Sequence, residues 1–385
     1  MEYRKLGNTG MMVSAIGMGS EYVWFESEKT IRDVIDTALD AGINYIDLFM
    51  GTPHTRACIG KALKGRRDKV YLTGHLGCVD IRGQYVRTRN EPLCRKFMED
   101  YYKIVDTDYV DVLFMHNCDE LEDLEGILNG WMYEYASELK AQGKARFIGL
   151  SSHNTRTAMA AVKSGKIDVL MFPVNPIFNM LPQDIGYNHM CGLGGWALDE
   201  EDSAAYPTKQ ELYELCEERG VGIVAMKPFA AGSILKGGRR SHLGDIIELT
   251  PVQCISYVLS HPQVGCPVPG VASVKQLKEV LAYFDASEEE KDFSIINESM
   301  LSKFSNQCMY CNHCQPCPRL IDIAEVTKLA DAAERGLTLE LRARYAELRS
   351  KGEDCIHCGA CTRRCPFGID AEANMARAAK LFSKR

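Results

Sequence analysis

Short apolar runs alternate with amphipathic stretches of helical period from residue 13 to about residue 284, and this alternation restricts the fold more than any other feature. It predicts repeated β-α units with parallel strands. Eight units in a stretch of this length fit one closed (β/α)₈ TIM barrel. An open doubly wound sheet is the alternative, but no glycine-rich phosphate turn follows the first strand to support it. The eight predicted strands are Val13–Met18, Asn44–Leu48, Val70–Thr73, Val110–Met115, Arg146–Leu150, Val169–Phe172, Gly222–Ala225 and Val264–Pro267.

The alternation ends beyond Phe284, where an acidic segment over Ser287–Asp292 is typical of a helix start or a linker. A chain of 385 residues is long enough for one large domain and one small domain. We therefore predict a barrel over residues 1–285 and a second, helical module over residues 286–385, with a helix at Ile323–Leu348. Within the barrel, Asn179–Pro207 follows the sixth strand and is predicted to be a lid or a binding loop on the catalytic rim.

Composition and charge exclude several classes of function. The formal net charge is −7, and an acidic chain rarely has the clustered Lys and Arg that nucleic-acid binding needs. No uninterrupted apolar run is long enough to cross a bilayer. The opening Met1–Lys5 does not begin a secretory signal. We expect a soluble, cytoplasmic protein with a small-molecule substrate and neither a nucleic-acid nor a membrane partner.

Eight of the sixteen cysteines fall in two tight groups after residue 307. Each group has three cysteines at two-residue spacing and a fourth before a proline, which is metal-ligand spacing rather than disulfide spacing. The pattern predicts two [4Fe–4S] clusters. A thiolate zinc site is the alternative, because paired C-x-x-C motifs also bind zinc. The groups are Cys308, Cys311, Cys314 and Cys317, followed by Pro318, and Cys355, Cys358, Cys361 and Cys365, followed by Pro366.

This cysteine pattern resembles that of two-cluster ferredoxins, in which the fourth cysteine of each group ligates the other cluster. The resemblance implies one cluster on Cys308, Cys311, Cys314 and Cys365, and its neighbour on Cys355, Cys358, Cys361 and Cys317. An electron conduit is the function that it implies, with a ferredoxin or a flavodoxin as a redox partner. Clusters that only hold a small domain together are the alternative.

Motifs in the predicted barrel resemble those of aldo-keto reductases, and they follow the family's order over nearly the whole barrel. The added cysteine module matches a ferredoxin-bearing subgroup that is often found in anaerobes. The matching segments are Tyr3–Gly10, Val13–Gly19, Gly42–Asp47, Ile59–Leu63, Tyr109–His116, Gly149–Ser152 and Pro269–Gly270.

The resemblance implies hydride transfer from NADPH to a carbonyl, with an Asp, Tyr, Lys and His set at the strand ends. The Asp falls on Asp47 and the His on His116, but the Tyr position is Thr52 and the Lys position is His75. Threonine is not a phenolic acid, and histidine is not a dependable cation near pH 7. We therefore predict a catalytic cluster of Asp47, His75 and His116, with His75 as the acid or base. An iron or zinc site on the same three residues is an alternative.

The family's cofactor positions also differ in this chain. The two positions of the family's nicotinamide-binding Ser-Asn pair hold Ser151 and Ser152, and the position of its Gln holds Met171. The position of its aromatic platform holds Met226, followed by Lys227. NADP(H) binding therefore stays open, and a flavin is not excluded. The residues with which the chain would bind such a cofactor are Ser151, Ser152 and Lys227, with Gly270, Ser273 and Lys275 at a phosphate.

Three functional hypotheses follow. The first is an oxidoreductase that reduces or oxidises a small organic substrate with electrons passed through the clusters. The second is a conventional NADPH-dependent carbonyl reductase with structural clusters, and the third is a non-catalytic electron carrier. Asp47 and His116 favour an enzyme, and the missing Tyr and Lys favour the first hypothesis over the second.

Overall fold

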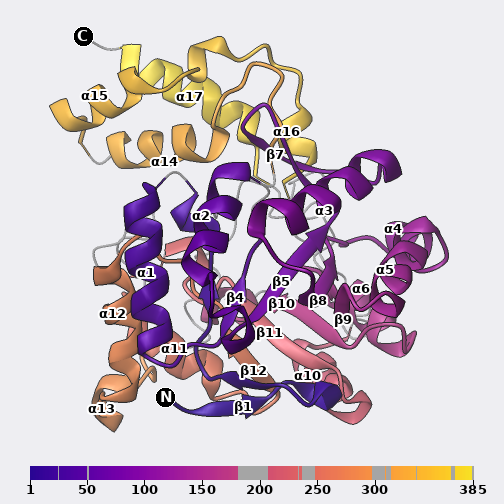
Figure 1. Ribbon diagram of the computed structural model, residues 1–385. Coiled ribbons are helices and arrows are strands. Elements are labelled where there is room, and N and C mark those ends of the chain that lie inside the picture. The colour runs from indigo at the N-terminus through magenta and orange to yellow at the C-terminus, as the bar shows by residue number, and fades with distance from the viewer. Residues whose placement is uncertain are drawn as a thin grey trace.

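The computed structural model consists of an α/β barrel and a smaller helical module at the C-terminal end of the chain (Figure 1). It describes residues 1–24, 26–49, 52–180, 207–232, 234–235, 248–296, 308, 314–334, 336–365 and 369–383. The predicted lid at Asn179–Pro207 falls almost wholly on residues 181–206 and so lies outside the described residues.

Eight strands form one sheet in the order β12-β11-β10-β9-β8-β5-β4-β3, and all neighbouring pairs are parallel. The two outer strands approach each other through a parallel bridge between Gly19 and Gly270, so the sheet is a nearly closed barrel. This confirms the predicted barrel and excludes the open sheet. The strands are β3 (Met18–Gly19), β4 (Tyr45–Asp47), β5 (Tyr71–Leu76), β8 (Val110–Met115), β9 (Ala145–Ser151), β10 (Val169–Pro173), β11 (Gly222–Met226) and β12 (Val264–Pro267).

The predicted first strand, Val13–Met18, is in fact two separate strands. Its start belongs to β2 (Met12–Ser14), which pairs antiparallel with β1 (Tyr3–Lys5), and only its end belongs to β3. The connection between β1 and β2 places Leu6 in the core cluster inside the barrel. A Cβ on Gly222 or Gly265 would lie within 2.8 Å of Leu6 atoms. The β1–β2 hairpin therefore packs against the interior of the barrel, and the chain has to bend before the barrel begins.

Helices cover the outside of the barrel, and many begin at a side-chain cap. Ser27, Thr52, Asn90, Asn154 and Thr208 each accept a hydrogen bond from a first-turn N–H. The helices are α1 (Glu28–Asp40), α2 (Pro53–Leu63), α3 (Glu91–Val105), α4 (Leu121–Leu128), α5 (Trp131–Ala141), α6 (Thr155–Lys163), α7 (Pro176–Met180), α10 (Lys209–Arg219), α11 (Pro251–Leu259) and α12 (Val274–Leu281).

One insertion interrupts the β-α alternation. Between β5 and α3 the chain forms an antiparallel hairpin of β6 (Cys78–Ile81) and β7 (Gln84–Arg87), which the sequence analysis did not predict.

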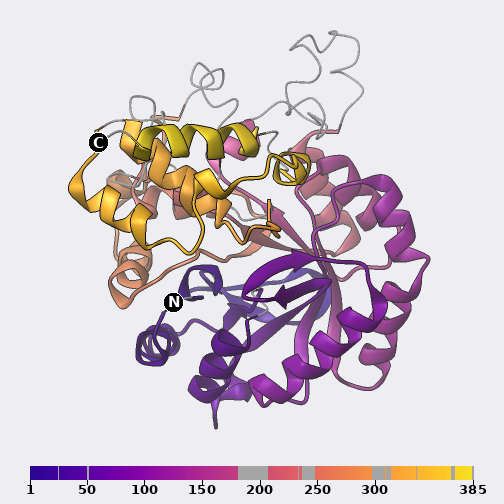
Figure 2. The ribbon, with the colours of Figure 1, turned by 90° about the horizontal axis from the view of Figure 1, so that it is seen from above.

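The C-terminal module is helical and has its own core. Its helices are α14 (Ile323–Glu334), α15 (Leu339–Glu347), α16 (Ala360–Arg363) and α17 (Ala371–Ser383), and the short α13 (Glu288–Lys291) precedes them. The predicted single helix at Ile323–Leu348 is two helices, because Thr338 caps a new start for α15. Figure 2 shows the module lying across one side of the barrel. Within the described part of the chain, no helix is long and apolar enough to span a membrane.

Candidate functional site

Asp47, His75 and His116 come together at the carboxyl ends of three neighbouring strands. Asp47 ends β4, His75 lies near the end of β5, and His116 directly follows β8. Because these strands are adjacent in the barrel, their ends meet. All three residues are buried, with exposed fractions of 6%, 3% and 4%.

Hydrogen bonds join these three side chains in a row. His75 Nε2 lies 2.8 Å from Asp47 Oδ1, and His75 Nδ1 lies 3.0 Å from His116 Nδ1. Thr73 Oγ1 donates to the same Asp47 oxygen at 2.7 Å. The ring of Phe49 packs against both imidazoles, with centroids 5.6 and 5.0 Å away.

Tyr85, which the sequence analysis missed, extends this row. It lies on β7, is 3% exposed, and its hydroxyl is 2.8 Å from His116 Nε2. Burial raises the pKa of Tyr85 well above its usual value, so the phenol keeps its proton. The local signal for this hairpin in the sequence is weak and consists of the pair Arg82 and Gly83, which both adopt positive φ as a tight two-residue turn requires.

The donor and acceptor in each hydrogen bond can be assigned by taking Asp47 as a carboxylate, which only accepts, and both imidazoles as neutral. His75 then carries its proton on Nε2, and its Nδ1 accepts from His116. The other nitrogen of His116 then accepts from the Tyr85 hydroxyl. Each hydrogen bond in this row, which we call the Tyr85–Asp47 chain, therefore points toward Asp47.

The predicted alternative of a metal on Asp47, His75 and His116 does not fit this geometry. Both nitrogens of His75 and both of His116 already have hydrogen-bond partners within the Tyr85–Asp47 chain. Neither imidazole therefore has a lone pair left for a metal. Over the described ranges, no group of His, Cys, Asp and Glu side chains is arranged to hold a single metal ion.

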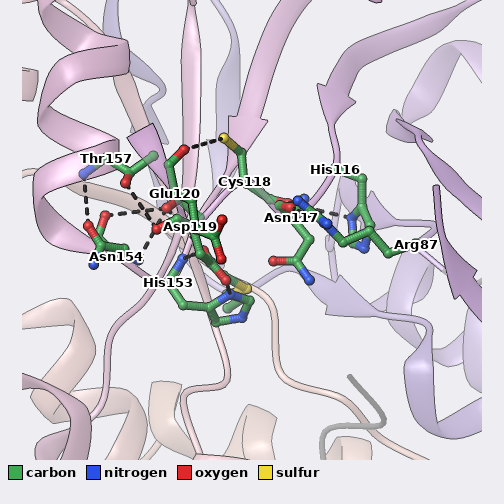
Figure 3. Close-up of polar contacts among 12 residues, drawn as sticks. Arg87, His116, Asn117, Cys118, Asp119, Glu120, His153, Asn154 and Thr157 are labelled. Carbon is green, nitrogen blue, oxygen red and sulfur yellow. Dashed lines mark hydrogen bonds and ion pairs between the residues drawn. The ribbon is translucent and has the colours of Figure 1, made fainter. Parts of the chain in front are cut away.

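A second polar network lies at the ends of β8, β9 and β11, and Figure 3 shows its Asp119–His153 part. Asp119 accepts from the backbone N–H of His153 at 2.5 Å and lies 3.1 Å from its Nδ1. Lys227 Nζ lies 3.2 Å from His153 Nε2. Burial lowers the pKa of His153 and so favours the neutral ring, whereas the nearby Asp119 acts in the opposite direction and raises this pKa.

One cavity of about 510 Å³ joins the two networks. Asp47, His75 and His116 line it together with His153 and Lys227. Its volume is in the range of small-molecule sites. Residues from the loops after β3, β11 and β12 complete the wall, together with residues of α12 and, among the described residues, Lys328 of the C-terminal module. They include Glu21, Phe229, Val268, Gln276 and Glu279.

The predicted cofactor residues divide into two groups. Ser151, Lys227 and Gly270 line the cavity, as do Met171 and Met226. Ser152, Ser273 and Lys275 are not among the lining residues. The Ser152 hydroxyl donates to Asp119, the Ser273 hydroxyl caps α12, and the Lys275 side chain is 86% exposed.

The cysteines of the module also divide into two groups. Cys317, Cys355, Cys358 and Cys361 line one small cavity within the module. Cys308 and Cys365 instead pack with the hydrophobic core of the barrel. No disulfide joins any of the described cysteines. Cys314 packs with the core of the module, and Cys311 lies outside the described residues.

Gln315 holds in place the backbone around Cys317. Its side-chain oxygen accepts from the N–H of Cys317 at 2.9 Å, and its amide nitrogen donates to the carbonyl of Ile321 at 2.8 Å. The same oxygen accepts from Gln84 on β7 at 3.2 Å. The hairpin that carries Tyr85 is therefore in contact with the cysteine loop.

Family comparisons cover both parts of the chain. The model of the Aldo/keto reductase family matches residues 14–245, and the model of a 4Fe-4S dicluster domain matches residues 304–369. Aldo-keto reductase YhdN of Bacillus subtilis is 33% identical over 161 residues, covering 40% of this chain but only 47% of that protein. The uncharacterized oxidoreductase YqkF of Bacillus subtilis is 21% identical over 322 residues, covering 75% of this chain and 94% of that protein.

A solved structure supports the same fold. The aldo-keto reductase AKR11C1 of Bacillus halodurans superimposes with a TM-score of 0.59 at 22% identity, covering 79% of this chain and 96% of the other. At that identity the likeness concerns the fold alone.

Proposed function

Because this chain belongs to the aldo/keto reductase family and carries a 4Fe-4S dicluster domain, we propose that it reduces a small carbonyl compound in the barrel cavity with electrons delivered through two [4Fe–4S] clusters. The observation that carries the proposal is the continuous Tyr85–Asp47 chain at the wall of that cavity, in place of the family's Tyr and Lys.

The chain of hydrogen bonds is suited to deliver a proton. Asp47 lines the cavity, and within the described residues no hydrogen bond reaches its second oxygen, Oδ2. When the Tyr85–Asp47 chain carries one extra proton, either Asp47 is protonated as the carboxylic acid or His75 is protonated as an imidazolium. Asp47 gives that proton to the substrate oxygen. A new proton entering at Tyr85 reaches Asp47 when each hydrogen bond shifts its proton by one position. This shift reverses the direction of every hydrogen bond, so both imidazoles have to return to the tautomers of the resting chain before the next turnover.

Reduction of a carbonyl to an alcohol consumes two electrons and two protons, one of which the Tyr85–Asp47 chain supplies and the other of which comes from water. When bound, [4Fe–4S] clusters supply electrons one at a time. The barrel residues therefore have to hold the substrate and its proton source in place between two electron arrivals. The buried, fully hydrogen-bonded His75 and His116 suit that task.

The cysteines fit the clusters that the domain match implies. Cys317, Cys355, Cys358 and Cys361 line a common cavity, so the thiol of the first group lies with three of the second, as the crossed ligation requires. We assign the other cluster to Cys308, Cys311, Cys314 and Cys365. The physiological donor would be a ferredoxin or a flavodoxin.

The nicotinamide end of the family's coenzyme site does not fit NADP(H). Ser152 is directed to Asp119, and Met171 and Met226 have neither the amide nor the aromatic ring that the family uses. The Ser151 hydroxyl already accepts from the N–H of Asn117 at 2.7 Å. We therefore assign no step to a nicotinamide, and a conventional NADPH-dependent reductase is the hypothesis that the experiment has to separate.

The test uses protein purified without oxygen, with reduced methyl viologen as the donor and a panel of small aldehydes and ketones as substrates. We expect oxidation of two viologen radicals for each carbonyl reduced. His75→Ala should lower turnover by about 100-fold or more, in the range of acid–base catalysis. The control is His54→Gln, which changes an exposed histidine on α2. Turnover that needs NADPH and persists at an unchanged rate in His75→Ala would show the proposal to be wrong.

A further inference from the structure

Lys227 has no role in the proposed proton delivery, yet hydrogen bonds hold its backbone in a defined conformation. Its backbone has φ +56°, a left-handed conformation that is unfavourable for a residue other than glycine. Asn175, which is 1% exposed, donates from Nδ2 to the Lys227 carbonyl at 2.9 Å, and the N–H of Ala230 donates to the same oxygen at 2.9 Å. The loop after β11 is therefore held in a strained shape.

This loop conformation places the ammonium group of Lys227 at the wall of the cavity. From the end of β11 the Lys227 side chain reaches past β10 to His153, which follows β9. Asp119 holds the proton of His153 on Nδ1, so Nε2 presents a lone pair that accepts from Lys227. The imidazole is neutral and orients the ammonium without neutralising it.

The ammonium has donors left for a ligand. A lysine ammonium has three N–H bonds, and His153 takes one of them. Across the described part of the chain, no carboxylate lies within ion-pair distance of Lys227; its other recorded contact is the Met226 sulfur at 4.0 Å, a weak acceptor. Two N–H bonds therefore have no acceptor among the described residues and can bind one in the cavity.

The charges of the cavity wall favour one orientation of an anion. Asp47 lies on the opposite part of the barrel sheet, at the end of β4, where it would repel a negative group. Glu21 also lines the cavity; burial raises its pKa, and Lys227 acts in the other direction. An organic anion would thus place its negative end on Lys227 and its remaining part near Asp47 and His75.

We propose that Lys227, oriented by His153 and Asp119, binds the carboxylate of the substrate, so that the cavity takes oxo acids rather than neutral carbonyl compounds. This inference rests on the proposed function for the identity of the bound molecule as a substrate. A coenzyme phosphate has the same anionic chemistry, and the experiment separates the two sources.

The test measures binding by calorimetry on the anaerobic, iron-loaded protein, without turnover. The probes are phenylglyoxylate, which is an oxo acid, acetophenone, which is a neutral ketone of similar shape, and inorganic pyrophosphate. We expect Lys227→Gln to weaken phenylglyoxylate binding by at least about tenfold, the effect of losing a hydrogen bond to a charged group. Binding of acetophenone and pyrophosphate should stay unchanged. The control is Lys103→Gln, which alters an exposed lysine on α3.

A pair of variants at His153 tests the positioning role. Gln can still accept from Lys227 through its side-chain oxygen, whereas Leu cannot. His153→Leu should weaken phenylglyoxylate binding, and His153→Gln should retain most of it, with the iron content of both variants showing that the protein is intact.

Three results would overturn the inference: no binding of phenylglyoxylate to the unaltered protein, equal losses for phenylglyoxylate and acetophenone in Lys227→Gln, or a loss for pyrophosphate alone. The last result would assign Lys227 to a coenzyme phosphate. Binding that depends on Lys227 in a protein that reduces no carbonyl would leave the anion site standing and refute the proposed function instead.

Discussion

Tyr85 and His116 show how single residues determine the direction of the proton path. Tyr85 donates to His116 Nε2, and this fixes the proton of His116 on the nitrogen that faces His75. Without that donor, His116 could turn its proton toward Nε2, and the next hydrogen bond toward Asp47 would be lost. A residue that does not line the cavity therefore controls the protonation of residues that do.

Tyr85→Phe keeps the ring but removes the hydroxyl. We expect kcat to fall by about 10- to 100-fold with little change in KM, because the substrate does not touch this residue. The pH dependence of kcat should shift as well, since His116 loses a fixed donor. Tyr102→Phe is the control, because the Tyr102 hydroxyl donates to the Lys144 carbonyl, away from the site. An unchanged pH profile in Tyr85→Phe would remove Tyr85 from the proton path.

His153 should make stability depend on pH. Burial lowers its pKa in the folded protein below the value of about 6.5 in the unfolded chain, so the unfolded state binds the proton more readily. The contribution is therefore present above about pH 6.5 and is lost as the pH falls below that value. Chemical unfolding of the unaltered protein and of His153→Gln between pH 8 and pH 5 measures it. We expect a shallower loss of stability in the variant, and parallel curves would contradict the assignment.

At the scale of elements, the β6–β7 hairpin supplies the part of the site that the sequence did not predict. Apolar periodicity located the strands that carry Asp47, His75 and His116, and adjacency in the barrel explains their meeting. The hairpin strands have four residues each, too few for periodicity to separate them from a loop. The contact of Tyr85 with His116 spans 31 positions and depends on how the hairpin folds over the barrel end.

The same limit applies to the predicted phosphate residues on α12. Lys275 follows the cap Ser273 by two positions and faces solvent, whereas Gln276, Glu279 and Val280 face the cavity. A sequence motif locates the helix start, but the rotation of the helix decides which side chains reach a ligand.

The contact between the hairpin and the module centres on Gln315. Gln315→Met would leave the Cys317 N–H and the Ile321 carbonyl without their buried partner, at a cost of about 1–3 kcal/mol for each group. We expect faster release of iron to a chelator under anaerobic conditions. Gln84→Leu removes only the contact from the hairpin and is the matched control, with release close to that of the unaltered protein. Equal release rates in all three proteins would contradict this role.

At the scale of the whole molecule, the two sets of cysteines have different surroundings. Cys308 and Cys365 pack with the barrel core, whereas Cys314, Cys317, Cys355 and Cys361 pack with the core of the module. Cys365 lies with Cys308, and Cys317 lies with Cys355 and Cys361, as the proposed crossed ligation assigns them, although each belongs to the other group in the sequence. Under that proposal, the cluster of Cys308 and Cys365 would be the one that reaches the barrel core, with Cys314 on the side of the module.

Paired substitutions test the crossed ligation through iron content. Cys358→Ala should lower the content from about eight irons to about four. Adding Cys317→Ala should cause no further loss, because both thiols serve the same cluster. Adding Cys314→Ala instead should remove nearly all the iron. A further loss with Cys317→Ala as large as that with Cys314→Ala would show that each sequence group holds its own cluster.

Lys328 of α14 forms part of the cavity wall, so one surface belongs both to the barrel site and to the metal-bearing module. Thermodynamic linkage makes such an effect reciprocal: a ligand that gains affinity from an ordered α14 must stabilise that helix in return. Damage to the module by air would then weaken the hold on the organic ligand even where every barrel residue is intact. Oxygen would therefore lower the occupancy of the site by its organic ligand as well as stop the delivery of electrons to it.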